Sequence, residues 1–305
     1  MSLHAITTYF NPCRYRTRRA HYDRFRAALD DSNVRCLTVE IAFGDEEFEL
    51  DPDRGIVQIR SGSLLWQKER LLNLAASWLP DHFDKVAWLD ADILFQNPDW
   101  ARDCDRVLDD VPIAQVWQRC DRLDSKGEST GDVVTSFAQR MQTEQALLDA
   151  GRYEVHGHTG YGWAMRRDVF RRVGLYEGAV SGSADHFMAH AIFDRYGTCV
   201  EGALKHDHRQ LAHLKAWGRR FHACVQARLG VVPGDLHHLW HGDLADRQYF
   251  SRMHAITDHG FDPWTDIVAL PGRPLEWTDE AVSRKAGLTN FFQRYFATRK
   301  EDGHV

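Results

Sequence analysis

The chain has 305 residues, of which 43% are hydrophobic, and its formal net charge is −6 at pH 7. This length suits one large α/β domain with an extension, and the hydrophobic fraction supports a sizeable core. The negative charge argues against a protein that holds nucleic acid mainly by electrostatic attraction. The sequence contains one local basic patch, which consists of Arg14, Arg16, Arg18, Arg19, Arg24 and Arg26. This patch is either a solvated helix face or a phosphate contact.

The cysteines and the N-terminal segment bear on the cellular compartment. Six cysteines are scattered without any C-x-x-C pair, which fits reduced thiols and gives no zinc site. The first residues, MSLHAITTYFNP, lack the regions of a signal peptide. No apolar run reaches the roughly 18 residues needed to span a bilayer. We therefore expect a cytoplasmic protein with no membrane segment.

The first third of the chain alternates short β-rich runs with segments of helical spacing. The predicted strands are residues 5–10, 34–42, 56–60 and 85–89, and the predicted helices are residues 18–29 and 64–79. Strand, helix, strand order is typical of a mainly parallel sheet with helices packed against it. The expected fold class is therefore α/β, with a Rossmann-like sheet and a helical C-terminal extension.

The remaining two thirds continue the alternation. Predicted strands are 111–117 and 162–165, and predicted helices are 101–110, 136–150, 167–173, 185–194, 211–229 and 277–296. Residues 121–132, DRLDSKGESTGD, are polar and contain glycine, which predicts a mobile loop, either a lid over a ligand or a plain surface loop. We expect a catalytic domain over residues 1–260 and an extension with a polar tail over residues 261–305.

Two aspartates, Asp90 and Asp92, stand directly after the predicted strand 85–89. Such pairs are also common in turns and helix caps. Here apolar residues precede and follow the pair, and a buried, unpaired carboxylate is costly. At a strand end both side chains can reach one cation, which relieves their mutual repulsion. Ligands of open α/β sheets bind at the carboxyl ends of strands, so we expect a divalent metal here.

Four segments, in this order along residues 60 to 255, support a family resemblance. They are WQKERLLNLA, VAWLDADILF, GYGWAMRRDVF and HGDLADRQYFSRM, the last preceded by a cluster of histidines at positions 237, 238 and 241. The set resembles GT-A glycosyltransferases, whose D-x-D motif binds a divalent metal, and is most similar to the β-galactosyltransferase and chondroitin-type enzymes. The resemblance implies a nucleotide-sugar-dependent hexosyltransferase.

The resemblance also implies a division of labour at the metal. Asp92 is expected as a direct ligand, and Asp90 is expected to contact the donor ribose or to reach the metal through water. His241 is the expected third ligand, with a hydrogen-bonded core or surface histidine as the alternative. Magnesium prefers oxygen ligands and water, whereas imidazole is acceptable to manganese. We therefore expect Mn²⁺, with Mg²⁺ as the alternative, and a UDP-sugar as the donor.

The expected reaction is an inverting transfer to a hydroxyl acceptor, which needs a carboxylate to take the acceptor proton. Asp185, after the small-residue turn Ser181–Ala184, is the candidate catalytic base, although aspartate is also a preferred helix cap. The galactosyltransferases carry a run of acidic residues here, whereas this chain has SGSADHF with one acid. The acceptor therefore stays open among a glycan, a protein, a nucleic acid and a small molecule.

Five further residues are candidates for binding the donor. Tyr9 and Glu40 end the first two predicted strands, Arg70 and Asn73 lie on the helix before the acidic pair, and Trp163 lies in a glycine-flanked strand. The alternatives are a solvated position for Arg70 and a core position for Trp163. Two rival functions also fit an apolar strand followed by D-x-D: a haloacid-dehalogenase-like phosphohydrolase and a non-catalytic sugar-nucleotide-binding protein on the same fold.

Overall fold

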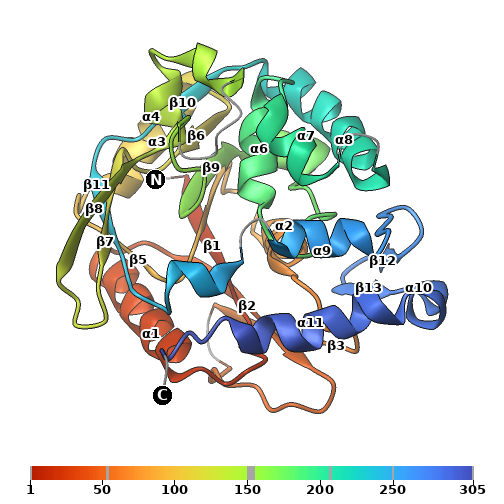
Figure 1. The fold of residues 1–305 in the computed structure, drawn as a ribbon. Coiled ribbons are helices and arrows are strands. Elements are labelled where there is room, and N and C mark those ends of the chain that lie inside the picture. The colour runs from red at the N-terminus through yellow and green to blue at the C-terminus, as the bar shows by residue number, and fades with distance from the viewer. Residues whose placement is uncertain (1, 53–54, 150–154, 206–207, 249–250, 304–305) are drawn as a thin grey trace.

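The computed structural model of the chain describes residues 2–52, 55–149, 155–205, 208–248 and 251–303. A seven-stranded sheet forms its centre, in the order β10-β6-β9-β4-β1-β2-β3 (Figure 1). The strands are β1 (Leu3–Tyr9), β2 (Cys36–Phe43), β3 (Ile56–Ser61), β4 (Lys85–Leu89), β6 (Ile113–Gln115), β9 (Gly162–Arg166) and β10 (Leu229–Val231). Only β9, between β4 and β6, runs antiparallel to its neighbours in this sheet as described. The expected α/β class with a mainly parallel sheet is confirmed.

Alternating side chains divide the core into two layers. In β4, Val86 and Trp88 belong to one buried cluster, and Ala87 and Leu89 belong to another. Successive residues of a strand point to opposite faces of a sheet, so the clusters lie on the two faces. The first contains residues of α2 (Lys68–Trp78), α5 (Arg167–Val173), α6 (Ala184–Ile192), α7 (Gly197–Ala203) and α8 (Arg209–Val225). The second contains residues of α1 (Arg16–Asp31) and α3 (Trp100–Asp110).

A second sheet lies beside the first, in the order β5-β11-β7-β8. Its strands are β5 (Ile93–Phe95), β7 (Arg119–Leu123), β8 (Ser129–Thr135) and β11 (Asp235–His238). The prediction of a mobile loop over residues 121–132 is therefore wrong, because β7 and β8 form an antiparallel hairpin. The Asp124 side chain accepts hydrogen bonds from the amides of Lys126 and Glu128, and Gly127 has a φ of +83°. The polar stretch thus encodes a tight turn.

The predicted long helices of the second half are shorter in the structure. Residues 136–150 form α4 (Phe137–Met141) and the 3-10 helix η1 (Gln145–Asp149), and residue 150 lies outside the described residues. The last predicted helix is divided into α10 (Asp279–Arg284) and α11 (Ala286–Thr298). The remaining elements are η2 (Leu244–Arg247), α9 (Ser251–Asp258), β12 (Ile267–Ala269) and β13 (Leu275–Trp277). No helix among the described residues is both long enough and apolar enough to cross a membrane.

The end of the chain returns to its beginning. Helix α11 brings the C-terminal residues beside α1, as the red and dark blue ribbons of Figure 1 show. Tyr15 donates a hydrogen bond to the carbonyl of Phe296 (3.0 Å), and Arg18 pairs with Glu301 (2.6 Å). Arg299 and Glu301, in the segment predicted as a polar tail, are buried. The predicted domain boundary between residues 260 and 261 stays a prediction.

Candidate functional site

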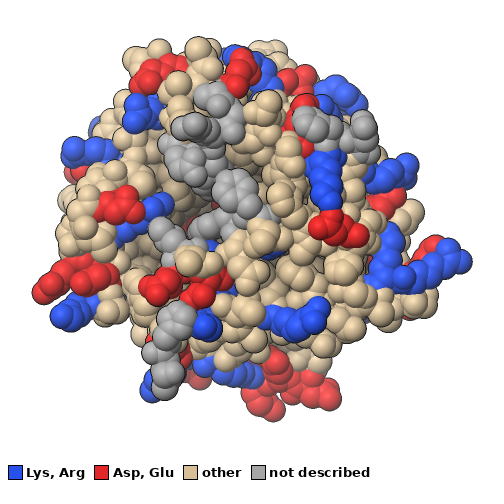
Figure 2. Space-filling model, in the orientation of Figure 1, with Lys and Arg blue, Asp and Glu red and all other residues tan. Residues whose placement is uncertain are grey.

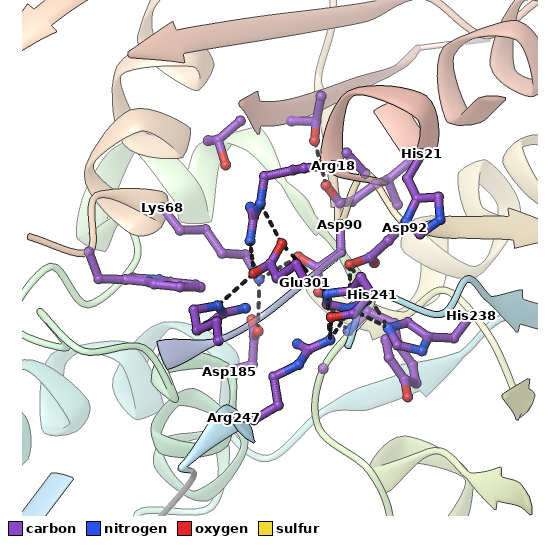
Figure 3. Close-up of a pocket in the computed structure, with 18 of the residues that line it drawn as sticks. Arg18, His21, Lys68, Asp90, Asp92, Asp185, His238, His241, Arg247 and Glu301 are labelled. Carbon is purple, nitrogen blue, oxygen red and sulfur yellow. Dashed lines mark hydrogen bonds and ion pairs between the residues drawn. The ribbon is translucent and has the colours of Figure 1, made fainter. Parts of the chain in front are cut away.

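A pocket opens at the carboxyl ends of β1 and β4, where residues 7–9 and 90–92 line it together (Figure 3). β1 lies between β2 and β4, so the strands that follow it along the chain are added on both of its sides. Ligands of open α/β sheets bind at the point where the strand order reverses in this way. The pocket has about 1230 Å³ of open space, including the part continuous with solvent. Its other walls come from α1, the first turn of α6, β11 and the end of the chain, which supplies Glu301.

Asp92 and two histidines meet on one side of this pocket. The Asp92 Oδ2 atom lies 3.0 Å from Nε2 of His241 and 3.9 Å from Nε2 of His238, and the two Nε2 atoms are 3.0 Å apart. The second sheet creates this contact, because β11 pairs with β5 so that His238 is opposite Ile93. The amide of Leu239 also donates to the carbonyl of Asp92 (2.8 Å). The backbone register thus fixes the histidines against the aspartate.

The protonation of these groups suits metal binding. Burial, with Arg247 beside the ring, lowers the pKa of His241 to about 4, although Asp92 opposes this shift. Burial also holds the pKa of His238 well below its usual range. Both imidazoles are therefore neutral near pH 7, the form that ligates metals. Among the described residues, the buried Asp92 Oδ1 atom has no hydrogen-bond partner, which leaves a carboxylate oxygen available to a cation.

The donor set fits a divalent metal of the manganese type. Asp92, His238 and His241 each offer one ligand atom, and these atoms all lie within 4.8 Å of one another. Carboxylate with imidazole suits Mn²⁺ better than Mg²⁺. Of the histidine cluster at positions 237, 238 and 241, only His241 was predicted as a ligand. The missed signal for His238 was its place at the end of a strand, three residues before His241.

Asp90 lies apart from this set. Its Oδ1 atom is 2.7 Å from the Lys68 ammonium, and its Oδ2 atom accepts a hydrogen bond from the amide of Tyr161 (3.2 Å). The same Lys68 ammonium is 2.9 Å from Oδ2 of Asp185. Burial opposes the charge of Lys68, but Asp185 and Asp90 hold its pKa well above its usual range. A lysine that sequence reasoning missed therefore links the acidic pair to the candidate base.

We expect Lys68→Met to destabilise the protein by about 3 kcal/mol or more, because removing one partner of a buried ion pair leaves uncompensated charge. Burial, with Asp185 and Asp92 adding to it, already raises the pKa of Asp90 to about 6 despite Lys68. Urea unfolding measures the change in free energy. The double variant Lys68→Met, Asp185→Asn should recover part of the loss, since one buried charge is removed. A loss below about 1 kcal/mol in the single variant would contradict the bridge.

Basic side chains gather inside the pocket. Its described lining includes six cationic residues, Arg18, Lys68, Arg122, Arg247, Arg252 and Arg299, and four acidic residues, Asp90, Asp92, Asp185 and Glu301. Burial opposes the Glu301 carboxylate, but Arg18 and Arg299 hold its pKa well below its usual range. Of the predicted basic patch, only Arg18 is among the lining residues. On the face drawn in Figure 2, by contrast, the described basic and acidic side chains are interspersed.

The candidate donor-binding residues are dispersed. Tyr9 lines the pocket, and its hydroxyl donates to Glu49 (2.6 Å). Glu40 is buried and accepts from the amide of Leu50 (3.2 Å) and from the Gln58 side chain (2.9 Å). Glu40 therefore fixes the loop after β2 and is not among the residues that line the pocket. Its predicted donor contact has no support in this geometry.

Three other candidates also lie outside the pocket lining. Arg70 pairs with Glu177 (3.2 Å) and donates to the carbonyl of Arg273 (2.7 Å). Asn73 donates to the same Glu177 (2.7 Å), so both residues of α2 hold neighbouring loops. Trp163 is fully buried, and its indole nitrogen donates to the carbonyl of Thr159 (2.7 Å). The core alternative describes Trp163 in this structure, and the donor roles of all three stay predictions.

No family model matches the chain, and no curated protein matches it in sequence. Solved structures match parts of it. Two are of Drosophila β-1,4-galactosyltransferase 7, one in complex with manganese, UDP-Gal and xylobiose and one with xylobiose. Their sequence identities to this chain are 13% and 14%, and their TM-scores are 0.35 and 0.32. Each match covers 64% of this chain and 62% of the galactosyltransferase chain. A mannosyl-3-phosphoglycerate synthase from Rubrobacter xylanophilus has 14% identity, coverage of 90% and 83%, and a TM-score of 0.39.

The chain thus spans less than two thirds of the length of the matched galactosyltransferase chains. These proteins are GT-A glycosyltransferases, the class that the sequence motifs resemble. The geometry of the pocket is the basis for assigning a function.

Proposed function

We propose that the protein is a metal-dependent glycosyltransferase that moves a sugar from a nucleotide-diphosphate sugar to a hydroxyl acceptor, with inversion at the anomeric carbon. One observation carries the proposal. Asp92, with a buried carboxylate oxygen that has no hydrogen-bond partner among the described residues, faces two neutral histidines at the carboxyl ends of β1 and β4. Asp92, His238 and His241 would hold Mn²⁺, which when bound would stabilise negative charge on the leaving diphosphate.

The charge of the pocket supports a diphosphate as the leaving group. Arg18 lies on α1 and Arg299 just after α11, and both hold Glu301, so the cationic wall is preorganised. Arg252 donates to Ser183 (2.9 Å) and to Tyr295 (2.8 Å), which orients a third guanidinium in the same pocket. Fixed cations need no rearrangement when charge develops on the phosphate oxygens. We expect a UDP-sugar as the donor, with Tyr9 and Asp90 contacting the nucleoside.

Asp185 is the proposed general base on the acceptor side. The helix begins at Ala184, so Asp185 lies in its first turn instead of at the cap position, and its carboxylate is directed to Lys68. The acceptor oxygen forms a bond to the anomeric carbon while the bond from that carbon to the diphosphate oxygen breaks. The acceptor proton passes to Asp185, and the electron pair of the broken bond leaves with the diphosphate.

A donor panel tests this proposal. The full chain, with and without Mn²⁺, is incubated with UDP-, GDP- and ADP-sugars, and released nucleoside diphosphate is measured. We expect slow release from one donor class in the presence of Mn²⁺, because water can replace the acceptor, and loss of this release with a chelator. His241→Ala should weaken the affinity for Mn²⁺ by at least about tenfold. Asp168→Asn, on the exposed face of α5, serves as the matched control and should behave as wild type.

Each alternative gives a different result in the same panel. A phosphohydrolase that cleaves the diphosphate would release a nucleoside monophosphate and a sugar 1-phosphate. A sugar-nucleotide-binding protein would bind a donor without releasing diphosphate at any Mn²⁺ concentration. Release that is equal with and without the chelator would contradict the metal assignment. Unchanged Mn²⁺ affinity in His241→Ala would remove that residue from the site.

A further inference from the structure

A second group of potential metal ligands lies in the helical layer beside the pocket, and one of its members, His186, lines the pocket. The group consists of His156, which precedes β9, His186 and His190 on α6, and Cys199 on α7. The ligand atoms of all four residues lie within 4.8 Å of one another, and the three histidines are buried. His186 and His190 are four residues apart, which places both imidazoles on the same face of α6. No residue of this group belongs to the Asp92 cluster.

The measured separations agree with tetrahedral coordination. The Nε2 atom of His190 lies 3.4 Å from Nε2 of His156 and 3.4 Å from Sγ of Cys199. With zinc–nitrogen distances near 2.05 Å and zinc–sulfur distances near 2.3 Å, a tetrahedral site places its ligand atoms about 3.4 to 3.6 Å apart. Two ligand pairs thus have the spacing of neighbouring vertices of a zinc site, and the other pairs lie within 4.8 Å.

The hydrogen bonds of two of the histidines also support metal binding. Nδ1 of His156 lies 3.0 Å from the carbonyl of Gly157, and Nδ1 of His190 lies 2.7 Å from the carbonyl of Arg195. A carbonyl oxygen only accepts, so in both rings Nδ1 carries the hydrogen and Nε2 presents a lone pair when the ring is neutral. Two lone pairs that face each other at 3.4 Å repel unless a cation lies between them.

We propose that His156, His186, His190 and Cys199 form a structural zinc site. Three imidazoles with one thiolate and no carboxylate suit Zn²⁺ and disfavour Mn²⁺ and Mg²⁺. Backbone carbonyls that orient ligating imidazoles are the usual outer-shell partners of such sites. Burial raises the pKa of the Cys199 thiol, and zinc binding displaces the thiol proton to solvent. The expectation of no zinc site considered only paired cysteines, and here one cysteine joins three histidines from two other segments.

The site would anchor one wall of the pocket. His186 directly follows Asp185, and His156 lies just before residues 158–161, which line the pocket. A single ion would therefore join the start of α6 to that segment and fix the position of the Asp185 backbone. This inference does not depend on the proposed transferase function, because metal binding is measured without any substrate.

Cobalt substitution tests the proposal. The full chain is stripped of metal with a chelator, and one equivalent of Co²⁺ is added. We expect the intense visible bands of tetrahedral cobalt and a near-ultraviolet thiolate-to-cobalt charge-transfer band, both removed by Zn²⁺. Cys199→Ala should lose the charge-transfer band, and His190→Ala should lower the cobalt affinity by at least about 100-fold, beyond the usual effect of an outer-shell partner.

Matched variants separate this site from the rest of the protein. Cys104→Ala removes a buried thiol from the opposite layer, and His254→Ala removes an exposed imidazole. Asp92→Asn alters the other candidate metal site. All three should keep the charge-transfer band. The wild-type spectrum is decisive if a ligand variant fails to fold: absence of the band in the wild type, or its persistence in folded Cys199→Ala, would overturn the proposal.

Discussion

Replacement of Asp185 with asparagine is expected to lower the rate of sugar transfer between about 10²-fold and 10⁴-fold, the range typical of a lost general base. Asparagine keeps the shape of the side chain but cannot take the acceptor proton. The donor should still bind with an unchanged Kd, because the proposed metal ligands and the arginines are intact. Single-turnover transfer and donor titration measure the two quantities separately.

Two controls distinguish a base from a merely structural acid. Asp185→Glu keeps the carboxylate and should restore part of the transfer rate. Asp185 is also held by Lys68 at 2.9 Å, so the free energy of unfolding of each variant has to be compared. Full transfer activity in a folded Asp185→Asn variant would rule out the base role.

Replacement of Asp92 with asparagine is expected to lower kcat/KM by about 10³-fold or more, because it removes the one carboxylate of the proposed metal set. The Asp92 Oδ2 atom is 3.0 Å from His241, and an asparagine can still make a hydrogen bond there. The fold should therefore persist, with a change in the free energy of unfolding below about 1.5 kcal/mol. Electron paramagnetic resonance of free Mn²⁺ measures the lost affinity directly.

The comparison variant is Asp168→Asn, which removes an exposed carboxylate paired with Arg172 on α5. It should keep wild-type Mn²⁺ affinity and activity. High Mn²⁺ should rescue Asp92→Asn in part if the defect is one of binding. Wild-type Mn²⁺ affinity in Asp92→Asn would show that the ion, if one acts, is held elsewhere.

Local patterns were enough to predict the layout of the sheet. The alternation of β-rich runs and helical spacing predicted β1, α1, β2, β3, α2 and β4 to within a few residues, because each of these is a single periodic segment. The hairpin of residues 119–135 was missed because most of its residues are polar and its turn chemistry resembles that of a loop. Strand β7 of this hairpin is stabilised by pairing with β11, a contact distant in sequence.

The residues of the candidate site could also be predicted only in part. Asp90 and Asp92 stood out because acidic groups between apolar residues need a reason, and the ligand role of His241 came from the family resemblance. Lys68 did not stand out, because a lysine at the start of an amphipathic helix is usually solvated. Only the packing of α2 near α6 turns its side chain toward two aspartates. The donor positions of Arg70 and Asn73 came from the resemblance, and in this chain both side chains hold neighbouring loops instead.

The burial of Glu301 between Arg18 and Arg299 has a consequence for the order of synthesis. A ribosome releases β1, α1 and the acidic pair long before residue 301 emerges, so the nascent chain carries the guanidinium of Arg18 without its carboxylate partner. Domains fold as units once their sequence is available. The pocket is therefore completed only after residue 301 has emerged, and a ribosome-bound chain arrested earlier holds an unfinished site.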